Sequence, residues 1–190
     1  EYIKNNILPH YNTFDQAHDM RHVEAVISRS IELANSLNHP TINLDIVYAV
    51  AAYHDIGMIK GRENHAKYSH DYVLQDENLK QFFDSNEIQI IAEACEDHST
   101  SSGHIPRTIY GKIVSDSDKD NDLKTSLMRL WDFSIDHFPQ LTFDERILDI
   151  QKQIKLRFGE GEKVRFYLPY TRNQEYLKTM TQLSTDTVAL

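Results

Sequence analysis

Apolar residues recur at intervals of three and four along most of the chain, which is the spacing of one buried face of an α-helix. The first such segment runs from His22 to Leu37 and carries valine, isoleucine, leucine and alanine on one stripe. The second begins where Thr41 or Asn43 can cap a helix, and it runs to Asp55 with Gly57 as its stop. The pattern therefore predicts two helices in this part of the chain.

The same spacing predicts helices over the rest of the sequence. Two of them are preceded by capping boxes, formed by Thr142 with Glu145 and by Thr171 with Gln174. A short extended piece is expected at 164–168. The predicted helices run from about Glu63 to Gln75, from Ser85 or Asn86 up to His98, from about Arg107 into an acidic run at 116–122, from Leu123 to Phe138, from Phe143 to Phe158, and onward from Thr171.

Composition agrees with a globular and mainly helical chain. Of 190 residues, 40% are hydrophobic and 26% charged, with only six glycines and five prolines. This length suits one compact domain, and no linker rich in proline, glycine or serine divides it. We therefore expect an all-α protein that forms a single domain over residues 1–190.

The formal net charge of −9 argues against broad electrostatic binding to nucleic acid or to an anionic membrane, because both need a basic surface. No apolar stretch approaches the length of a membrane span, and no basic segment leads into an apolar one at the start. The single cysteine, Cys95, allows no internal disulfide, which fits a reducing compartment. We expect a cytoplasmic protein whose ligand, if it is a small anion, meets local cations or a metal.

The second predicted helix ends in a histidine and an aspartate, His54-Asp55. On a helical projection Leu44, Val47, Ala51 and His54 share one face, so the imidazole should point toward the core. Asp55 lies on the flank of that face. An unpaired carboxylate there would be costly, and a divalent metal is the commonest compensation beside a histidine.

Further histidines and aspartates occupy helix ends or apolar faces in the same way. The predicted helix up to His98 again ends an apolar stripe in a histidine. Together these residues have the composition of a metal site that uses nitrogen and oxygen ligands. The candidate ligands are His22, His54, Asp55, His65, His98 and Asp118.

This set resembles the HD-domain superfamily of metal-dependent phosphohydrolases, whose core pattern is a histidine, a His-Asp pair and a later aspartate. The pattern is present here as His22, His54-Asp55 and Asp118. Five strings follow the order of the family across roughly residues 14 to 122, namely HDMRHVEAV, AAYHDIG, ENHAKYS, IIAEACEDHS and KIVSDSDKDND. The resemblance implies an HD-type helical bundle with its metal-binding core at about 14–122 and a helical extension at about 123–190.

The resemblance also implies a first ion on His22, His54, Asp55 and Asp118 and a second on His65 and His98, with Asp55 as the bridge. Two such ions would clamp a phosphate and acidify a water, so that a metal-bound hydroxide is the nucleophile. His54 and Asp55 would then be central to catalysis. One or two divalent ions are expected, and Mn, Fe, Co, Ni or Zn suit the imidazole ligands better than Mg.

Several positions leave alternatives open. His70 and His104 stand near ligands in sequence and could replace His65 or His98 in this assignment. Asp116 lies two residues before Asp118; we choose Asp118 because the ligand aspartate of the family stands between a small and a basic residue, here Ser117 and Lys119.

Cationic side chains near these ligands are candidates for binding substrate. Lys60, Arg62 and Arg107 could neutralise phosphate oxygens, and Lys119 is a candidate catalytic residue because it follows a ligand. His18 could hydrogen-bond substrate or a ligand, one turn before His22.

The first functional hypothesis is hydrolysis of a small anionic phosphoester, such as a nucleotide. A di-iron oxygenase with the same ligands is the second, and a non-catalytic regulator stabilised by metal is the third. Trp131 and the aromatic residues at 166–170 could form a surface for a homo-oligomer or another partner, or they could pack on the helical bundle.

Overall fold

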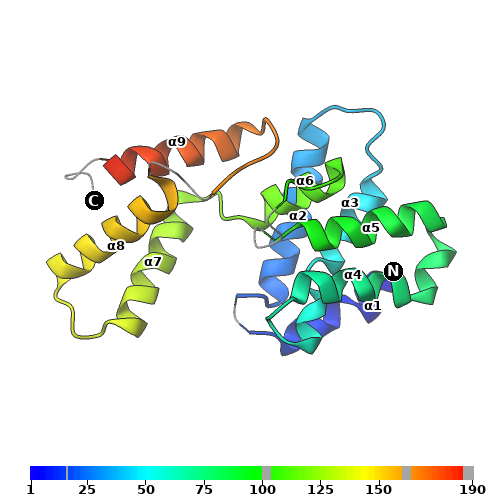
Figure 1. Ribbon diagram of the computed structural model, residues 1–190, viewed down its shortest axis with the longest axis horizontal. Helices are drawn as coiled ribbons and strands as arrows, with labels where there is room; N and C mark the ends of the chain where they lie inside the picture. Colours follow the sequence, from blue (N-terminus) through cyan, green and yellow to red (C-terminus); the bar gives the residue numbers. More distant parts are fainter. Residues whose placement is uncertain (16, 100–103, 160–163, 186–190) are drawn as a thin grey trace. The chain divides into compact units, whose positions relative to one another are not determined.

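The computed structural model describes residues 1–15, 17–99, 104–159 and 164–185 of the chain, and these residues form helices and turns with no strand among them (Figure 1). The predicted all-α class is confirmed. By their contacts the residues group into two compact units, Glu1–Lys119 and Asp120–Leu190. We expected one domain with an extension from about residue 123, and the boundary between the units lies three residues before that position.

The first unit contains the helices that carry every candidate metal ligand. Its α-helices end and begin close to where the sequence pattern placed them, and short 3-10 turns join several of them. In chain order the elements are α1 (Tyr2–Asn6), η1 (Leu8–Thr13), α2 (Met20–Ser36), α3 (Leu44–Tyr53), η2 (Ile56–Lys60), α4 (His65–Gln75), η3 (Glu77–Gln81), α5 (Ser85–Asp97) and α6 (Ile109–Asp118).

The helix starts are fixed by side chains that accept hydrogen bonds from free backbone N–H groups. Asp19 caps α2 by accepting from the backbone N–H of His22, and Asn43, one of the two predicted candidates, caps α3. Asp84 and Glu87 form a capping box at α5. Thr108 accepts from Gly111 at α6. The cap of α2 fixes the first turn of that helix, which carries the candidate ligand His22.

Helix α3 is the central element of the first unit, with α2, α5 and α6 packed against it (Figure 1). All of its residues from Ile46 to Tyr53 are buried except Tyr48, and the alanines among them let neighbouring helices approach closely. Val47, Ala51 and His54 are completely buried, as the helical projection predicted. Leu44 was expected on the same face but is 40% exposed, because it lies in the first turn of the helix.

The second unit contains α7 (Leu123–His137), α8 (Phe143–Phe158) and α9 (Thr171–Thr185). The predicted capping box of Thr142 and Glu145 at α8 is confirmed. The three helices bury a common apolar core. That core consists of Leu130, Ile150, Ile154, Phe158, Tyr176 and Met180.

One local prediction in the second unit was wrong. Thr171 is the first residue of α9 and does not precede it, since the backbone N–H of Gln174 already donates to the carbonyl of Tyr170. Residues 164–168 lie outside the helices, and they pair with no other described segment as a strand.

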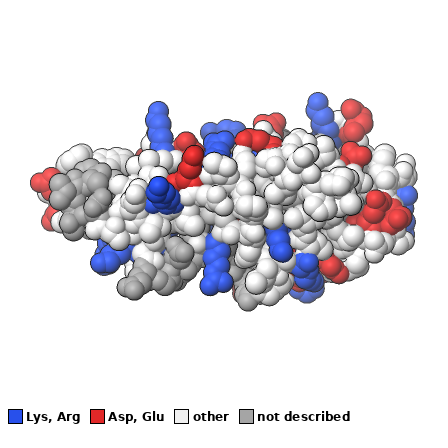
Figure 2. Space-filling view, turned by 90° about the horizontal axis from the view of Figure 1, so that it is seen from above, with Lys and Arg blue, Asp and Glu red and all other residues white. Residues whose placement is uncertain are grey.

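No helix in the described part of the chain has the length and apolar character needed to cross a bilayer. On the face drawn in Figure 2, basic and acidic side chains are interspersed, and its described residues form no broad basic area. This distribution accords with the net charge of −9.

Candidate metal centre

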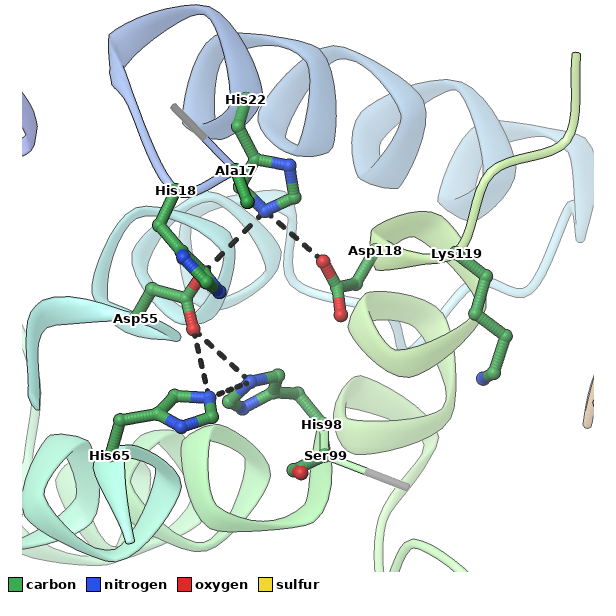
Figure 3. A pocket seen from close by; sticks show the side chains of 9 residues that line it. All are labelled: Ala17, His18, His22, Asp55, His65, His98, Ser99, Asp118 and Lys119. Atoms are coloured by element: carbon green, nitrogen blue, oxygen red, sulfur yellow. Dashed lines mark hydrogen bonds and ion pairs between the residues drawn. The ribbon is translucent and has the colours of Figure 1, made fainter. Parts of the chain in front are cut away.

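The six candidate ligands meet in the first unit, although they lie on five segments of the chain. His22 belongs to the first turn of α2, His54-Asp55 follows α3, His65 begins α4, His98 follows α5 and Asp118 ends α6. All of them except His54 line a cavity of about 280 Å³ (Figure 3). They come together because each of these helices has one of its two ends at the same edge of the bundle. The described lining residues are Ala17, His18, His22, Asp55, His65, His98, Ser99, Asp118 and Lys119.

Gly57 explains how α4 comes so close to Asp55. A Cβ atom at this position would collide with the backbone oxygen of His65 and would lie 2.6 Å from the backbone nitrogen of Ser69. The backbone N–H of Gly57 instead donates to the hydroxyl of Ser69 at 2.9 Å. The absence of a side chain thus lets the first turn of α4 pack directly on the segment after the His-Asp pair.

The ligand atoms form two groups. His22, His54 and Asp118 make up the first, and Asp55, His65 and His98 the second; within each group the atoms lie within 4.8 Å of one another. In the first group the Nε2 atoms of His22 and His54 are 3.3 Å apart, and His22 Nε2 is 3.1 Å from Asp118 Oδ1. In the second group the Nε2 atoms of His65 and His98 are also 3.3 Å apart.

Asp55 connects the two groups through its two carboxylate oxygens. Oδ2 faces the first group, at 3.1 Å from His54 Nε2 and 3.6 Å from His22 Nε2. Oδ1 faces the second, at 3.2 Å from His65 Nε2 and 3.3 Å from His98 Nε2 (Figure 3). A carboxylate in this position is able to ligate one ion with each oxygen.

Backbone carbonyls determine which ring nitrogen faces the cavity. The Nδ1–H groups of His54, His65 and His98 donate to the carbonyl oxygens of residues 51, 62 and 95 at 2.8, 2.9 and 2.6 Å. Because a carbonyl only accepts, each Nδ1 must hold the proton, and in a neutral ring the lone pair is then on Nε2. Three lone pairs therefore point into the cluster.

The buried carboxylate of Asp55 needs positive charge beside it. Asp55 is 2% exposed, and its Oδ1 atom is buried without a hydrogen-bond partner. Protonated histidines would meet this need in part. Burial lowers the pKa of His22, but hydrogen bonds with the carboxylates of Asp118 and Asp55 outweigh that effect and raise it to about 9. Closely spaced imidazole and carboxylate groups that attract protons so strongly are equally suited to divalent ions.

The pKa values of the two carboxylates, Asp55 and Asp118, shift in the opposite direction to that of His22. Burial opposes the ionisation of Asp55, yet the nearby His54 and the hydrogen bonds from His22, His54 and His65 hold its pKa well below the usual range. The pKa of Asp118 is also lowered, because its hydrogen bond with His22 and the nearby His54 and His98 together outweigh the cost of burial. Both groups are therefore available as anionic ligands at neutral pH.

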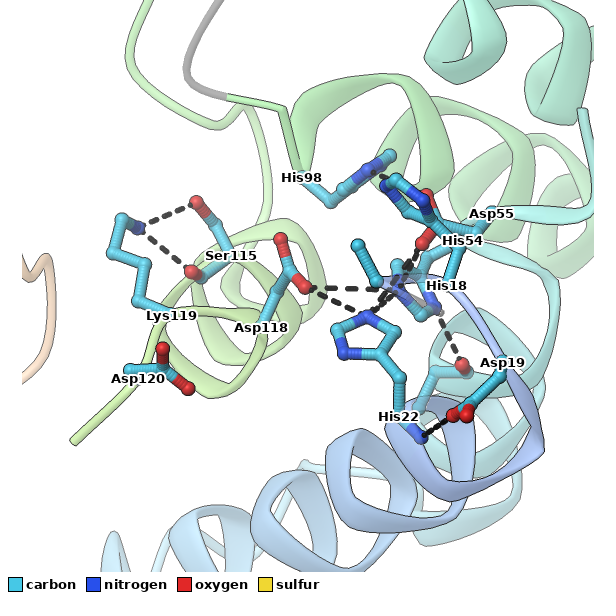
Figure 4. Close-up of polar contacts among 12 residues, drawn as sticks. His18, Asp19, His22, His54, Asp55, His98, Ser115, Asp118, Lys119 and Asp120 are labelled. Atoms are coloured by element: carbon cyan, nitrogen blue, oxygen red, sulfur yellow. Dashed lines mark hydrogen bonds and ion pairs between the residues drawn. The ribbon is translucent and has the colours of Figure 1, made fainter. Parts of the chain in front are cut away.

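Lys119 lines the cavity, but its amine does not reach the two groups. Its Nζ donates to the carbonyl and the hydroxyl of Ser115 at 2.7 and 3.0 Å and lies 3.7 Å from Asp116 (Figure 4). The side chain thus folds back along α6, away from the histidines (Figure 3). A catalytic role for Lys119 stays a prediction, and the geometry does not support it.

His18 is the predicted substrate-binding residue that the fold does bring to the cavity. Its ring lies 6.1 Å from that of His22 and 6.0 Å from that of His65, measured between centroids, so it stands between the two groups. Its Nδ1 is 2.7 Å from an oxygen of Asp15. The ring is therefore held at the edge of the centre.

The other three predicted substrate-binding residues are not among the described residues that line the cavity. Lys60 lies over the ring of Tyr68, 5.2 Å from its centroid, and Arg62 has a 71% exposed side chain 3.7 Å from Asp15. Arg107 binds Asp97 and Glu96. Substrate binding by these three side chains stays a prediction, and the geometry does not favour it because each has a partner outside the lining of the cavity.

The alternatives left open by the sequence also have other contacts. His104 Nε2 lies 2.8 Å from buried Asp97, and His70 Nδ1 lies 3.0 Å from Asp71. Asp116 is fully buried near Lys119 and is not in either ligand group. The geometry thus favours His65, His98 and Asp118 over these three residues as ligands.

One residue beside the centre was missed by the sequence analysis. Tyr11 is fully buried, and its hydroxyl donates to the carbonyl of Ala52 at 3.0 Å and accepts from the backbone N–H of Asp55 at 3.3 Å. Burial, with the charge of Asp55 nearby, raises its pKa well above the usual value, so the hydroxyl stays protonated. No ligand motif includes a tyrosine at this distance, and the apolar pattern of residues 1–15 is too short to identify it.

The first unit is all-helical, and its helix ends bring histidines and aspartates together. This arrangement is that of a metal-binding helical domain. Comparison with protein families gives one match, the HD domain, over residues 20–121. The chain belongs to the HD domain family, as its motifs predicted. Searches of the curated proteins and of the solved structures gave no match. Its membership indicates a domain of the metal-dependent hydrolase type.

Proposed function

We propose that the chain is a metal-dependent phosphohydrolase with a centre for two divalent ions. The observation that carries this proposal is the position of Asp55, whose two oxygens face two separate groups of ligand atoms. A site for one ion would not need two further histidines on the far side of the same carboxylate. The HD domain match over residues 20–121 supports the reaction class.

In this proposal His22, His54 and Asp118 hold the first ion, and His65 and His98 hold the second. Asp55 is shared between them. Bound divalent ions would supply positive charge that polarises a phosphoester and lowers the pKa of an attacking water. Backbone carbonyls keep His54, His65 and His98 in the ligating tautomer, so little reorganisation is needed at these three residues when an ion binds.

The substrate we propose is a small anionic phosphoester, such as a nucleotide. The cavity of about 280 Å³ is lined by His18 and Ser99 in addition to the ligands, and both are able to form hydrogen bonds with phosphate oxygens. Because the amine of Lys119 turns back to Ser115, charge on the substrate would be met mainly by the ions. Imidazole-rich coordination favours Mn, Fe, Co, Ni or Zn over Mg.

The test is release of phosphate from a panel of nucleotides and small phosphoesters by protein loaded with Mn²⁺, Co²⁺ or Ni²⁺. At least one substrate should be hydrolysed, and His54→Ala should abolish the activity. His70→Ala is the matched control, since His70 is a partly buried histidine of the same unit that faces Asp71. It should retain activity.

Two results would contradict the proposal. Absence of phosphate release across the panel, with full metal loading, would favour a regulatory metal-binding domain. Tight binding of two irons during anaerobic purification, followed by substrate-dependent consumption of dioxygen, would favour the di-iron oxygenase, which needs the same ligands.

A further inference from the structure

Tyr11 is a buried tyrosine that the N-terminal segment inserts against the end of α3. It belongs to η1, which has Pro9 in its first turn, and it is 0% exposed. The family match begins at residue 20, so Tyr11 lies outside it. Its ring stacks on that of His54, with centroids 6.5 Å apart and planes inclined by 30°. This segment of the chain therefore reaches one of the candidate ligands directly.

The hydroxyl of Tyr11 binds backbone groups that the end of a helix leaves without partners. It donates to the carbonyl of Ala52 and accepts from the N–H of Asp55. The neighbouring carbonyl of Ala51 accepts from Nδ1 of His54. Polar groups at the end of α3 are thus used to hold the two adjacent ligands.

The orientation of the Asp55 carboxylate depends on its backbone as well as on the imidazoles of His22, His54, His65 and His98, which lie 3.1 to 3.6 Å from its oxygens. Asp55 adopts φ −108° and ψ 7°, the sparsely populated region between helix and strand. Its Oδ1 atom has no hydrogen-bond partner in the protein. The direction in which the carboxylate points therefore depends in part on the backbone at residue 55, and Tyr11 is bonded to that backbone.

We propose that Tyr11 is a positioning residue for the metal centre: its hydroxyl holds the backbone of Asp55 so that the two carboxylate oxygens face the two ligand groups. The inference rests on the proposed two-ion function. Without the hydroxyl, the backbone at Asp55 is released and the bridge is misaligned. The second ion suffers most, because its group has only His65 and His98 besides Asp55, whereas the first retains three other ligands.

The chain offers a matched pair of variants. Tyr11→Phe removes the hydroxyl next to Asp55 and leaves the packed ring. Tyr53→Phe removes an equally buried hydroxyl on α3 itself, which donates to Asp76 at 2.7 Å, outside the cavity. Both variants lose a buried hydrogen bond, so thermal unfolding should register a loss in each. Only the hydrogen bonds lost in Tyr11→Phe lie at the metal centre.

The experiment is titration of the metal-free, full-length proteins with Mn²⁺ by calorimetry, together with electron paramagnetic resonance of the loaded proteins. Tyr11→Phe should weaken binding of the second ion by ~10-fold, the effect of losing a group that supports a ligand, and the first by less than ~3-fold. The spectrum of the exchange-coupled Mn²⁺ pair should change, since that coupling runs through the bridge. Tyr53→Phe should match the wild type in both measurements.

Unchanged affinities and an unchanged spectrum in Tyr11→Phe would overturn the positioning role. Equal changes in Tyr11→Phe and Tyr53→Phe would overturn it as well, because the effect would then follow stability alone. A wild-type protein that binds no second ion would instead refute the proposed two-ion centre, and the wild-type titration separates this failure from the other two.

Discussion

Replacing Asp55 by asparagine tests the bridge with the smallest change of shape. The variant keeps the volume of the side chain but removes a negative charge that lies 3.1 to 3.6 Å from the Nε2 atoms of four histidines. At the first group His22, His54 and Asp118 remain. At the second only two imidazoles remain, fewer than a divalent ion requires from the protein in stable sites.

The expected magnitude follows from this count of ligands. Loss of a supporting group outside the ligand shell typically costs 10-fold to 100-fold in metal affinity, so loss of a charged ligand should cost at least ~100-fold, or ~2.8 kcal/mol, at each ion. Both ions should therefore be weakened by one substitution. The assay is Mn²⁺ titration by calorimetry, with elemental analysis of the dialysed protein.

Retention of two ions by Asp55→Asn with unchanged affinity would refute the reasoning. Loss of one ion while the other binds with unchanged affinity would also refute it, because a carboxylate that served a single group could not be the bridge. Circular dichroism of the variant should match that of the wild type, so that a change in binding is not a change in folding.

The remaining predictions separate the two ions, the fold around them and the second unit. His65→Ala should release the second ion and spare the first, as measured by a fall in metal content from two ions to one; loss of both would contradict the grouping. Gly57→Ala should lower the free energy of unfolding by about 3 kcal/mol, because a Cβ atom there collides with the backbone of α4. A thermal melt equal to that of the wild type would contradict this prediction, since it would show that the segment can move aside. Ile154→Ala should cost about 3 kcal/mol by leaving a cavity in the core of the second unit, with hydrogen exchange accelerated in α7 to α9. Metal affinity should stay unchanged in this variant, because every ligand lies within residues 1–119, and a large loss of affinity would contradict that expectation.

Much of the fold follows from regular spacing in the sequence, and the candidate site follows from that spacing together with the resemblance to the HD-domain family. The burial of Val47, Ala51 and His54 results from the 100° rotation per residue in a helix, which is independent of distant parts of the chain. Capping boxes are similarly local, and the one at Thr142 and Glu145 was predicted correctly. Ligands at helix ends were identifiable because a histidine or aspartate that ends an apolar stripe faces the core.

The positions of long cationic side chains could not be predicted in this way. Arg107 lies next to a ligand-bearing helix, but its guanidinium binds the buried carboxylate of Asp97 and that of Glu96. Lys119 follows a ligand directly, yet its flexible side chain turns back to Ser115. Such choices depend on which partners the tertiary structure brings near. Tyr11 illustrates the same limit, since its contact with Asp55 spans 44 residues of sequence.

The central claim is that Asp55 bridges two ions, and a crystal structure of the Mn²⁺-loaded protein with anomalous scattering tests it most directly. We expect two anomalous peaks per chain, one bounded by His22, His54 and Asp118 and the other by His65 and His98, with one oxygen of Asp55 on each. A single peak, or two peaks without Asp55 between them, would contradict the account.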